Sequence, residues 1–195
     1  MRILLTNDDG IHAVGIRDLY KGLVAAGHEV LVAAPISEQS AVGHAITIAL
    51  PLRVKEFQEH GFKGLGVSGT PADCVKLALT TLCETPPDVV VSGINAGANV
   101  GVDILYSGTV SAATEGALMG YPAVAVSADD YAPTDLTEQG RYVADFIASR
   151  PWEAVPPRCV LNLNFPAVPL SQAKDLRLCP PTSAVYEDWY VTRQD

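Results

Sequence analysis

The first 34 residues, MRILLTNDDGIHAVGIRDLYKGLVAAGHEVLVAA (residues 1–34), carry a strand–helix–strand pattern. Residues 2–6 are a short aliphatic run typical of a buried strand, and a helix is predicted over residues 14–26 because apolar side chains recur there every three or four positions. Residues 29–33 form a second aliphatic run that is apolar on both faces, as buried parallel strands are. The pattern predicts two parallel strands joined by a crossover helix.

The remaining chain repeats this alternation and predicts an α/β protein with a Rossmann-like, doubly wound, mainly parallel sheet. Further strands are predicted at 89–91, 123–127, 160–163 and 176–179, and further helices at 71–83, 109–119 and 136–149. Three strand-like pieces have no helix between them and predict a short antiparallel excursion; they are residues 45–50, 52–57 and 62–67. With 195 residues, we expect one domain over residues 1–195.

Composition restricts the partners. Hydrophobic residues make up 48% of the chain and charged residues 18%, which is typical of a folded enzyme. The formal net charge of −9, without a Lys/Arg cluster, argues against long nucleic acid as a partner. A phosphate-bearing ligand would therefore need a metal, backbone N–H groups or a helix N-terminus to meet its charge.

Targeting and redox signals are absent from the sequence. No signal peptide and no apolar run of membrane-spanning length is present, so we expect a cytoplasmic location and no membrane partner. The four cysteines are scattered, with no metal-binding spacing, and are expected to be buried, reduced thiols.

Polar segments follow three of the predicted core strands, where a doubly wound sheet binds its ligands. The first is Asn7-Asp8-Asp9-Gly10, the second runs from Pro35 to His44, and the third is residues 92–99. Two adjacent carboxylates repel each other unless a cation lies between them. Oxygen ligands favour Mg²⁺, Mn²⁺ or Ca²⁺ over Zn²⁺. The aspartate pair also suits a solvent-facing turn, and the pair alone does not distinguish the two.

A further signal is the small-residue step Ser107-Gly108-Thr109 at the start of a predicted helix. Such a step leaves backbone N–H groups free to hold a phosphate. As a capping sequence it is common. Asn95 and Asn99 are equally compatible with turns, and His44 with a buried, hydrogen-bonded side chain.

Taken together, five motifs resemble the survival protein E (SurE) family of 5′/3′-nucleotidases along nearly the whole chain. They are Asn7-Asp8-Asp9-Gly10-Ile11-His12-Ala13, Ser40-Ala41-Val42-Gly43-His44, Gly69-Thr70-Pro71-Ala72-Asp73-Cys74-Val75, Ser92-Gly93-Ile94-Asn95-Ala96-Gly97 and Tyr106-Ser107-Gly108-Thr109-Val110. The resemblance implies one divalent metal ion, Mg²⁺ or Mn²⁺, held by Asp8, Asp9, Ser40 and Asn95. It also implies nucleoside monophosphates as substrates and a homodimer or homotetramer.

For the mechanism we expect a metal-activated water, because coordination lowers the pKa of water and polarises the phosphoryl group. Asp9 would orient or deprotonate that water. The phosphate would be bound by Asn95, Ser107, Gly108 and Thr109. Ser107 as a covalent nucleophile is disfavoured, since no residue near it in the sequence makes a convincing base.

The sequence departs from the family at one end. Family members usually continue several tens of residues past the segment resembling 186–190, whereas this chain stops at Asp195. We therefore expect a domain that is short at its C-terminus, with apolar surface open that longer relatives use in subunit association.

Other functions predict other features. Residues 1–35 also resemble the start of sugar-nucleotide glycosyltransferases, which need a second Rossmann domain for which the chain has no room. A phosphatase with an aspartyl intermediate needs Asp-x-Asp after the first strand, but Asn7 takes the first of these positions. Dinucleotide binding lacks its G-x-G-x-x-G motif. A non-catalytic nucleotide sensor is not excluded by any feature of the sequence.

Overall fold

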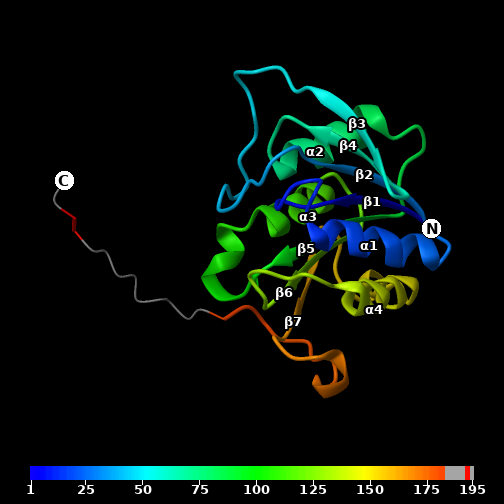
Figure 1. Cartoon of the computed structure of the whole chain (residues 1–195), viewed down its shortest axis with the longest axis vertical. Helices are drawn as coiled ribbons and strands as arrows, with labels where there is room; N and C mark the ends of the chain where they lie inside the picture. The colour runs from blue at the N-terminus through cyan, green and yellow to red at the C-terminus, as the bar shows by residue number, and fades with distance from the viewer. Residues whose placement is uncertain (183–191, 194–195) are drawn as a thin grey trace.

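A seven-stranded sheet forms the centre of the computed structural model, which describes residues 1–182 and 192–193 (Figure 1). The strands are β1 (Arg2–Thr6), β2 (Glu29–Pro35), β3 (Val54–Glu59), β4 (Phe62–Val67), β5 (Val89–Ala96), β6 (Ala123–Ala128) and β7 (Val160–Phe165). Their order is β3-β4-β2-β1-β5-β6-β7. Every neighbouring pair is parallel except β3 and β4. The predicted mainly parallel sheet with an antiparallel excursion is confirmed.

Helices cover both faces of the sheet (Figure 1). On one face α1 (Val14–Ala25) packs against α4 (Thr137–Ala148), and on the other α2 (Pro71–Leu77) packs against α3 (Gly108–Leu118). Because β2 lies on one side of β1 and β5 on the other, the winding reverses between β1 and β5. This is the position at which doubly wound sheets form a crevice outside their carboxyl ends.

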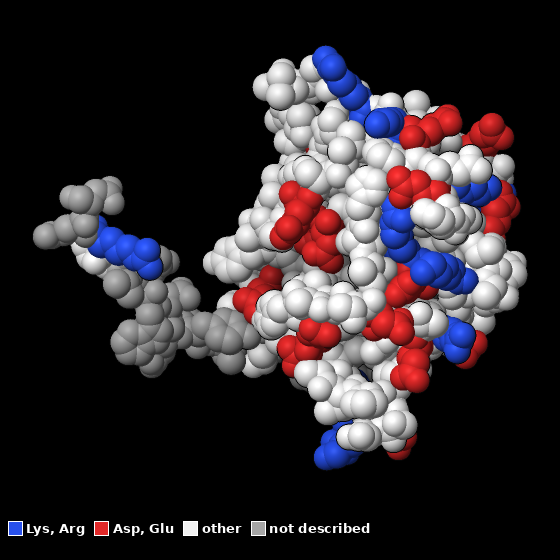
Figure 2. All heavy atoms as spheres, viewed as in Figure 1, with Lys and Arg blue, Asp and Glu red and all other residues white. Residues whose placement is uncertain are grey.

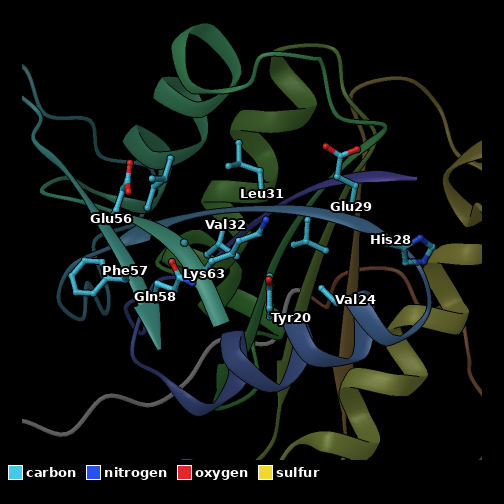
Figure 3. Close-up of a pocket in the computed structure, with 13 residues that line it drawn as sticks. Tyr20, Val24, His28, Glu29, Leu31, Val32, Glu56, Phe57, Gln58 and Lys63 are labelled. Carbon is cyan, nitrogen blue, oxygen red and sulfur yellow. The ribbon is translucent and has the colours of Figure 1, made fainter. Parts of the chain in front are cut away.

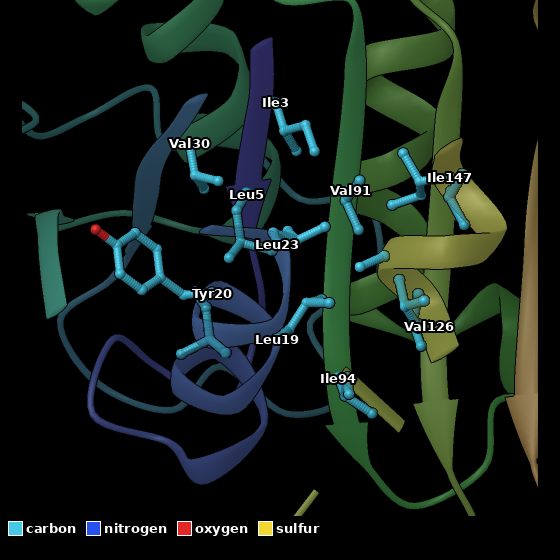
Figure 4. Close-up of a cluster of buried hydrophobic side chains, with 14 of the residues drawn as sticks. Ile3, Leu5, Leu19, Tyr20, Leu23, Val30, Val91, Ile94, Val126 and Ile147 are labelled. Atoms are coloured by element: carbon cyan, nitrogen blue, oxygen red, sulfur yellow. The ribbon is translucent and has the colours of Figure 1, made fainter. Parts of the chain in front are cut away.

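Apolar side chains hold these layers together. Figure 4 shows Ile3, Leu5 and Val91 of the sheet grouped with Leu19 and Leu23 of α1, and these side chains belong to one buried cluster. A second, alanine-rich cluster lies between the sheet and the pair α2 and α3. The two clusters fix the strands and therefore the loops that leave their carboxyl ends.

Four expectations about secondary structure are wrong or incomplete. Residues 45–50 are irregular although their apolar residues alternate, and no strand lies beside them in the described chain. Residues 176–179 are exposed and form no strand. The helix beginning at Pro71 ends at Leu77 and continues as a π-helical turn over Ala78–Leu82. The strand predicted at 89–91 extends to Ala96 and takes in part of the polar segment over residues 92–99.

The cysteines are free, as expected, but only partly buried. Cys74 is buried, whereas Cys159 and Cys179 are exposed. Within the described residues, no helix combines the length and the hydropathy needed to cross a bilayer.

Candidate functional site

A cavity of about 440 Å³ opens at the carboxyl ends of the parallel strands, beside the reversal of winding. Segments that follow or end β1, β2, β5 and β6 contribute to its wall. The residues that concern its chemistry are Asp9, Glu38, Ser40, Ala96, Tyr131 and Pro133. Acidic side chains gather over this side of the globular part, where Figure 2 shows no Lys or Arg.

Asp8 lies directly after β1 and is held by the first turn of α3. Its side chain is 5% exposed and accepts a hydrogen bond from the Thr109 hydroxyl. A Cβ at Gly108 would lie 2.7 Å from Cβ of Asp8, so only glycine lets α3 approach this closely. Burial raises the pKa of Asp8, and the negative charge of Glu38 adds to this, although hydrogen bonds from Thr109 oppose it.

Asp9 is held by a different element, the end of β5. Its Oδ2 accepts a hydrogen bond from the backbone N–H of Ala96 at 3.0 Å. Burial raises the pKa of Asp9 to about 6, with further contributions from the negative charges of Asp8 and Glu38. The Ala96 N–H lowers the pKa but does not compensate.

Ser40 and Asn95, the other two predicted metal ligands, lie on the segment after β2 and near the end of β5. The Ser40 hydroxyl donates to Oε1 of Glu38 at 2.6 Å, and the N–H of Gln39 donates to the carbonyl of Asp8 at 2.8 Å. Asn95 Nδ2 donates to the carbonyl of Gly97 at 2.7 Å, which leaves the amide oxygen as its free ligand atom. The structure thus brings Ser40 into the same cavity as Asp9, and Asn95 beside the residue that binds Asp9.

These residues fit a hard divalent cation. The donors are two carboxylates, a hydroxyl and an amide oxygen, as Mg²⁺ and Mn²⁺ prefer. Burial is the main cause of the raised pKa of both Asp8 and Asp9, and the charged groups that act on the two carboxyls are all negative. Among the described residues, no group of three or more His, Cys, Asp or Glu could hold a metal. The predicted ligand set contains only two residues of these types, Asp8 and Asp9. The absence of a larger group therefore does not test the set, which stays a prediction.

Three of the four residues predicted to bind phosphate lie at the start of α3, and the fourth, Asn95, lies on β5. Ser107 caps the helix, because its hydroxyl accepts from the N–H of Val110 at 3.0 Å. Ser107, Gly108 and Thr109 are all buried. The hydroxyls of Ser107 and Thr109 both form hydrogen bonds within the protein. The Thr109 hydroxyl donates to the carboxylate of Asp8. Phosphate binding here stays a prediction, and Thr109 gains a second role in holding Asp8.

Sequence reasoning missed two residues of the cavity. Glu38 stands two positions before Ser40 and adds a third negative charge beside Asp8 and Asp9. Tyr131 follows β6, a strand end that the motifs did not single out. The rule that ligands bind at strand ends would have directed attention to both.

A larger cavity, of about 500 Å³, lies elsewhere (Figure 3). It is bounded by α1, the amino-terminal part of β2 and the β3–β4 pair, and Tyr20, Glu56 and Lys63 are among its lining residues. Because Glu29 begins β2, this cavity opens at the opposite end of the sheet from Asp9. This cavity is the larger of the two, but the smaller cavity is the candidate site because Asp9, Glu38 and Ser40 line it.

Comparisons with known proteins find relatives along nearly the whole chain. The sequence profile described as "Survival protein SurE" matches residues 3–188. The chain is 83% identical over 195 residues to "5'-nucleotidase SurE" of Solidesulfovibrio magneticus, covering all of this chain and 76% of that protein. It is 64% identical to the protein of the same name from Maridesulfovibrio salexigens, covering 78% of it. The crystal structure of "Sure Protein" from Aquifex aeolicus superposes with a TM-score of 0.75 at 37% identity, over 88% of this chain and 68% of that one.

Proposed function

The chain belongs to the survival protein SurE family, and on that premise we propose that it is a divalent-metal-dependent phosphomonoesterase acting on nucleoside 5′-monophosphates, and on 3′-monophosphates as well. The proposal is supported by relatives that carry the name 5'-nucleotidase at 83% and 64% identity. The observation that carries it is the pair of carboxylates at the reversal of winding, with the pKa of Asp9 raised to about 6.

Asp8, Asp9, Ser40 and Asn95 would hold one Mg²⁺ or Mn²⁺ ion. When bound, such an ion lowers the pKa of water and polarises a phosphoryl oxygen. Asp8 and Asp9 come from the segment after β1, Ser40 from the segment after β2, and Asn95 from β5, so the donors belong to three different parts of the chain. Metal occupancy would also relieve the repulsion between the two aspartates.

In the proposed reaction, water attacks phosphorus, the P–O bond to the nucleoside breaks, and the nucleoside oxygen takes up a proton from solvent. Asp9 orients the attacking water and accepts its proton. Asn95 and the first turn of α3, over Ser107, Gly108 and Thr109, bind the phosphate oxygens. A helix N-terminus favours negative charge by about 0.3–1 kcal/mol.

A covalent route through Ser107 lacks a base among the residues that the structure describes. The Ser107 hydroxyl accepts a hydrogen bond from Val110 N–H, and no carboxylate or imidazole among the described residues is hydrogen-bonded to it. Because a serine hydroxyl needs such a partner to become a nucleophile, direct attack by water is the better account. We expect no phosphoserine at position 107 in acid-quenched enzyme, and measurable residual hydrolysis by Ser107→Ala.

The experiment is phosphate release from a panel of nucleoside monophosphates by wild type, Asp8→Asn and Asp9→Asn. Each variant should lose about a hundredfold or more in turnover, the range for loss of a positioned acid or base, while remaining folded. Asp145→Asn, which removes an exposed carboxylate on α4, is the matched control and should be fully active. Wild-type rates in either site variant would refute the assignment.

A further inference from the structure

The cavity beside Asp9 has two chemically different walls. Asp9, Glu38 and Ser40 make one wall polar and acidic. The segment after β6 supplies the other, where Tyr131 and Pro133 present an aromatic ring and an apolar ring. A ligand filling both would have one end suited to metal and hydroxyl chemistry and another that is flat and uncharged.

Tyr131 is placed by close contact with the end of β5. A Cβ at Gly97 would lie 2.8 Å from Cε1 of Tyr131, so only glycine lets the ring approach the backbone here. Gly97 directly follows Ala96, whose N–H holds Asp9. The ring therefore contacts the residue that directly follows Ala96, whose N–H binds Asp9.

Backbone bonds fix both sides of this contact. The N–H of Gly97 donates to the carbonyl of Ala128 at 2.8 Å, which ties the end of β5 to the end of β6. One residue beyond the ring, the N–H of Ala132 donates to Oδ1 of Asp130 at 3.0 Å and closes a tight turn. The aromatic wall thus belongs to the irregular segment over residues 129–136 between β6 and α4, and these two bonds hold the start of that segment.

The ring contributes little to the core, since Tyr131 is 81% exposed whereas Tyr20 is 5% exposed. A single exposed aromatic residue is ordinary on a protein surface. This one differs because it lines the same cavity as Asp9 and Ser40, and the cavity has the volume of a small-molecule site. An aromatic face at such a place is suited to stacking on a planar ligand group.

We infer that the Tyr131 ring is the platform on which the nucleobase of the substrate stacks while the phosphate is held beside Asp9. The inference rests on the proposed nucleotidase function and adds the base-binding half of the site. Because every base has a stacking face, the platform selects nucleotides over simple sugar phosphates without reading one base. Purines, with the larger ring area, should bind more tightly than pyrimidines.

The test compares AMP with ribose 5-phosphate, which has the same sugar and phosphate but no base. Tyr131→Ala should raise KM for AMP about tenfold, the loss expected for one base–aromatic stack, with kcat within about twofold of wild type. KM for ribose 5-phosphate should not change. Tyr131→Phe should restore KM for AMP, and Tyr142→Ala, which removes a tyrosine from α4, should leave both substrates unaffected.

Equal changes for AMP and ribose 5-phosphate in Tyr131→Ala, or no change for either, would overturn the inference. Calorimetric titration with adenosine, which carries no phosphate, separates this contact from catalysis. Adenosine should bind Tyr131→Ala about tenfold more weakly than wild type. Equal affinity would overturn the inference even if nucleotidase activity is found, and weaker binding would support it even if no hydrolysis is detected.

Discussion

Two neighbouring aspartates are held by different parts of the fold, which is the central feature at the scale of residues. Thr109 of α3 fixes Asp8, whereas the N–H of Ala96 at the end of β5 fixes Asp9. Each partner donates to a carboxylate that burial disfavours in its charged form. The arrangement places two negative charges together at a cost to the metal-free fold.

The Asp9→Asn variant tests that cost. The pKa of Asp9 is about 6 in the folded protein and 3.8 ordinarily, so the folded state binds its proton more tightly. The resulting stabilisation is complete below about pH 4 and is lost as the pH rises through 6. At pH 7.5 the ionised Asp9 carboxylate lowers the free energy of unfolding by at most about 3 kcal/mol. Because the side chain is partly exposed, we expect a loss of about 1–2 kcal/mol.

In metal-free buffer, Asp9→Asn should therefore unfold at higher urea concentration than wild type at pH 7.5, with a smaller gain at pH 4.5. Asp145→Asn, on the surface of α4, should show no such gain. A less stable Asp9→Asn at pH 7.5 would show that burial does not govern this carboxyl.

The hydroxyl of Thr109 gives a second prediction. Thr109→Val keeps the shape of the side chain but removes the donor to buried Asp8, and loss of a bond to a charged group is worth about 1.5–3 kcal/mol. Metal affinity and turnover should both fall, by about tenfold or more. Thr114→Val is the matched control, because its hydroxyl donates only to Val110 within the same helix. Equal losses in the two variants would indicate a general effect on α3.

The side chains that the sequence predicted for the site differ in how well they could be placed. Asp8, Asp9 and Ser40 follow strand ends, so the sheet alone predicts that they lie near one another. The partners of Ser107 and Thr109 could not be predicted, since sequence does not show that α3 approaches Asp8 closely enough for Thr109 to bind it. Tyr131 was missed because a lone exposed tyrosine carries no motif.

At the scale of elements, the segment between β2 and β3 is held by polar contacts instead of buried apolar side chains. It carries Ser40, yet Ile46, Ile48 and Leu50 are exposed. Three bonds attach it to α2 and α3: His44 Nε2 to Glu115 Oε2 at 2.8 Å, Thr47 N–H to the Asp73 carboxylate at 3.0 Å, and Thr70 hydroxyl to the Ala45 carbonyl at 2.7 Å. Burial alone would raise the pKa of Glu115, but hydrogen bonds from His44 and Lys76 hold it below its ordinary value.

Removing the imidazole should loosen this segment. His44→Ala should speed hydrogen exchange at the Gln39, Gly43 and Thr47 amides about tenfold, as expected for losing a bond to a buried charged group. Lys76→Ala removes the other partner of Glu115 without touching the segment, and should leave those amides protected. Equal exchange in His44→Ala and wild type would show that the imidazole does not hold the segment.

The same segment contains residues 45–50, whose secondary structure could not be predicted from the sequence. The parallel strands and the start of α2 were predicted correctly, because aliphatic runs and the Thr70-Pro71-Ala72-Asp73 cap act locally. Residues 45–50 have the alternating pattern of a strand, but a strand needs a partner, and pairing is a non-local property. The same reason explains the strand wrongly expected at 176–179.

At the scale of the whole molecule, apolar side chains are exposed on the segment between β2 and β3 and on the turn before α3. Leu105 is 73% exposed, Ile48 86% and Leu50 72%, and the bond from Gly43 N–H to the Tyr106 carbonyl brings their segments together. Exposed apolar groups of this kind favour association. Light scattering should show a dimer or tetramer, and the double variant Ile48→Asp with Leu50→Asp should shift it toward monomer. A wild-type monomer at high concentration would contradict the expected assembly.

Hydrolysis is proposed to require a cation held by Asp8, Asp9, Ser40 and Asn95. The most direct measurement is phosphate release from AMP by wild-type protein stripped with EDTA and then titrated with Mg²⁺ or Mn²⁺. We predict no turnover after stripping and saturable recovery with either ion, and no recovery in Asp8→Asn at the same concentrations. Turnover at the full rate in excess EDTA would contradict this prediction.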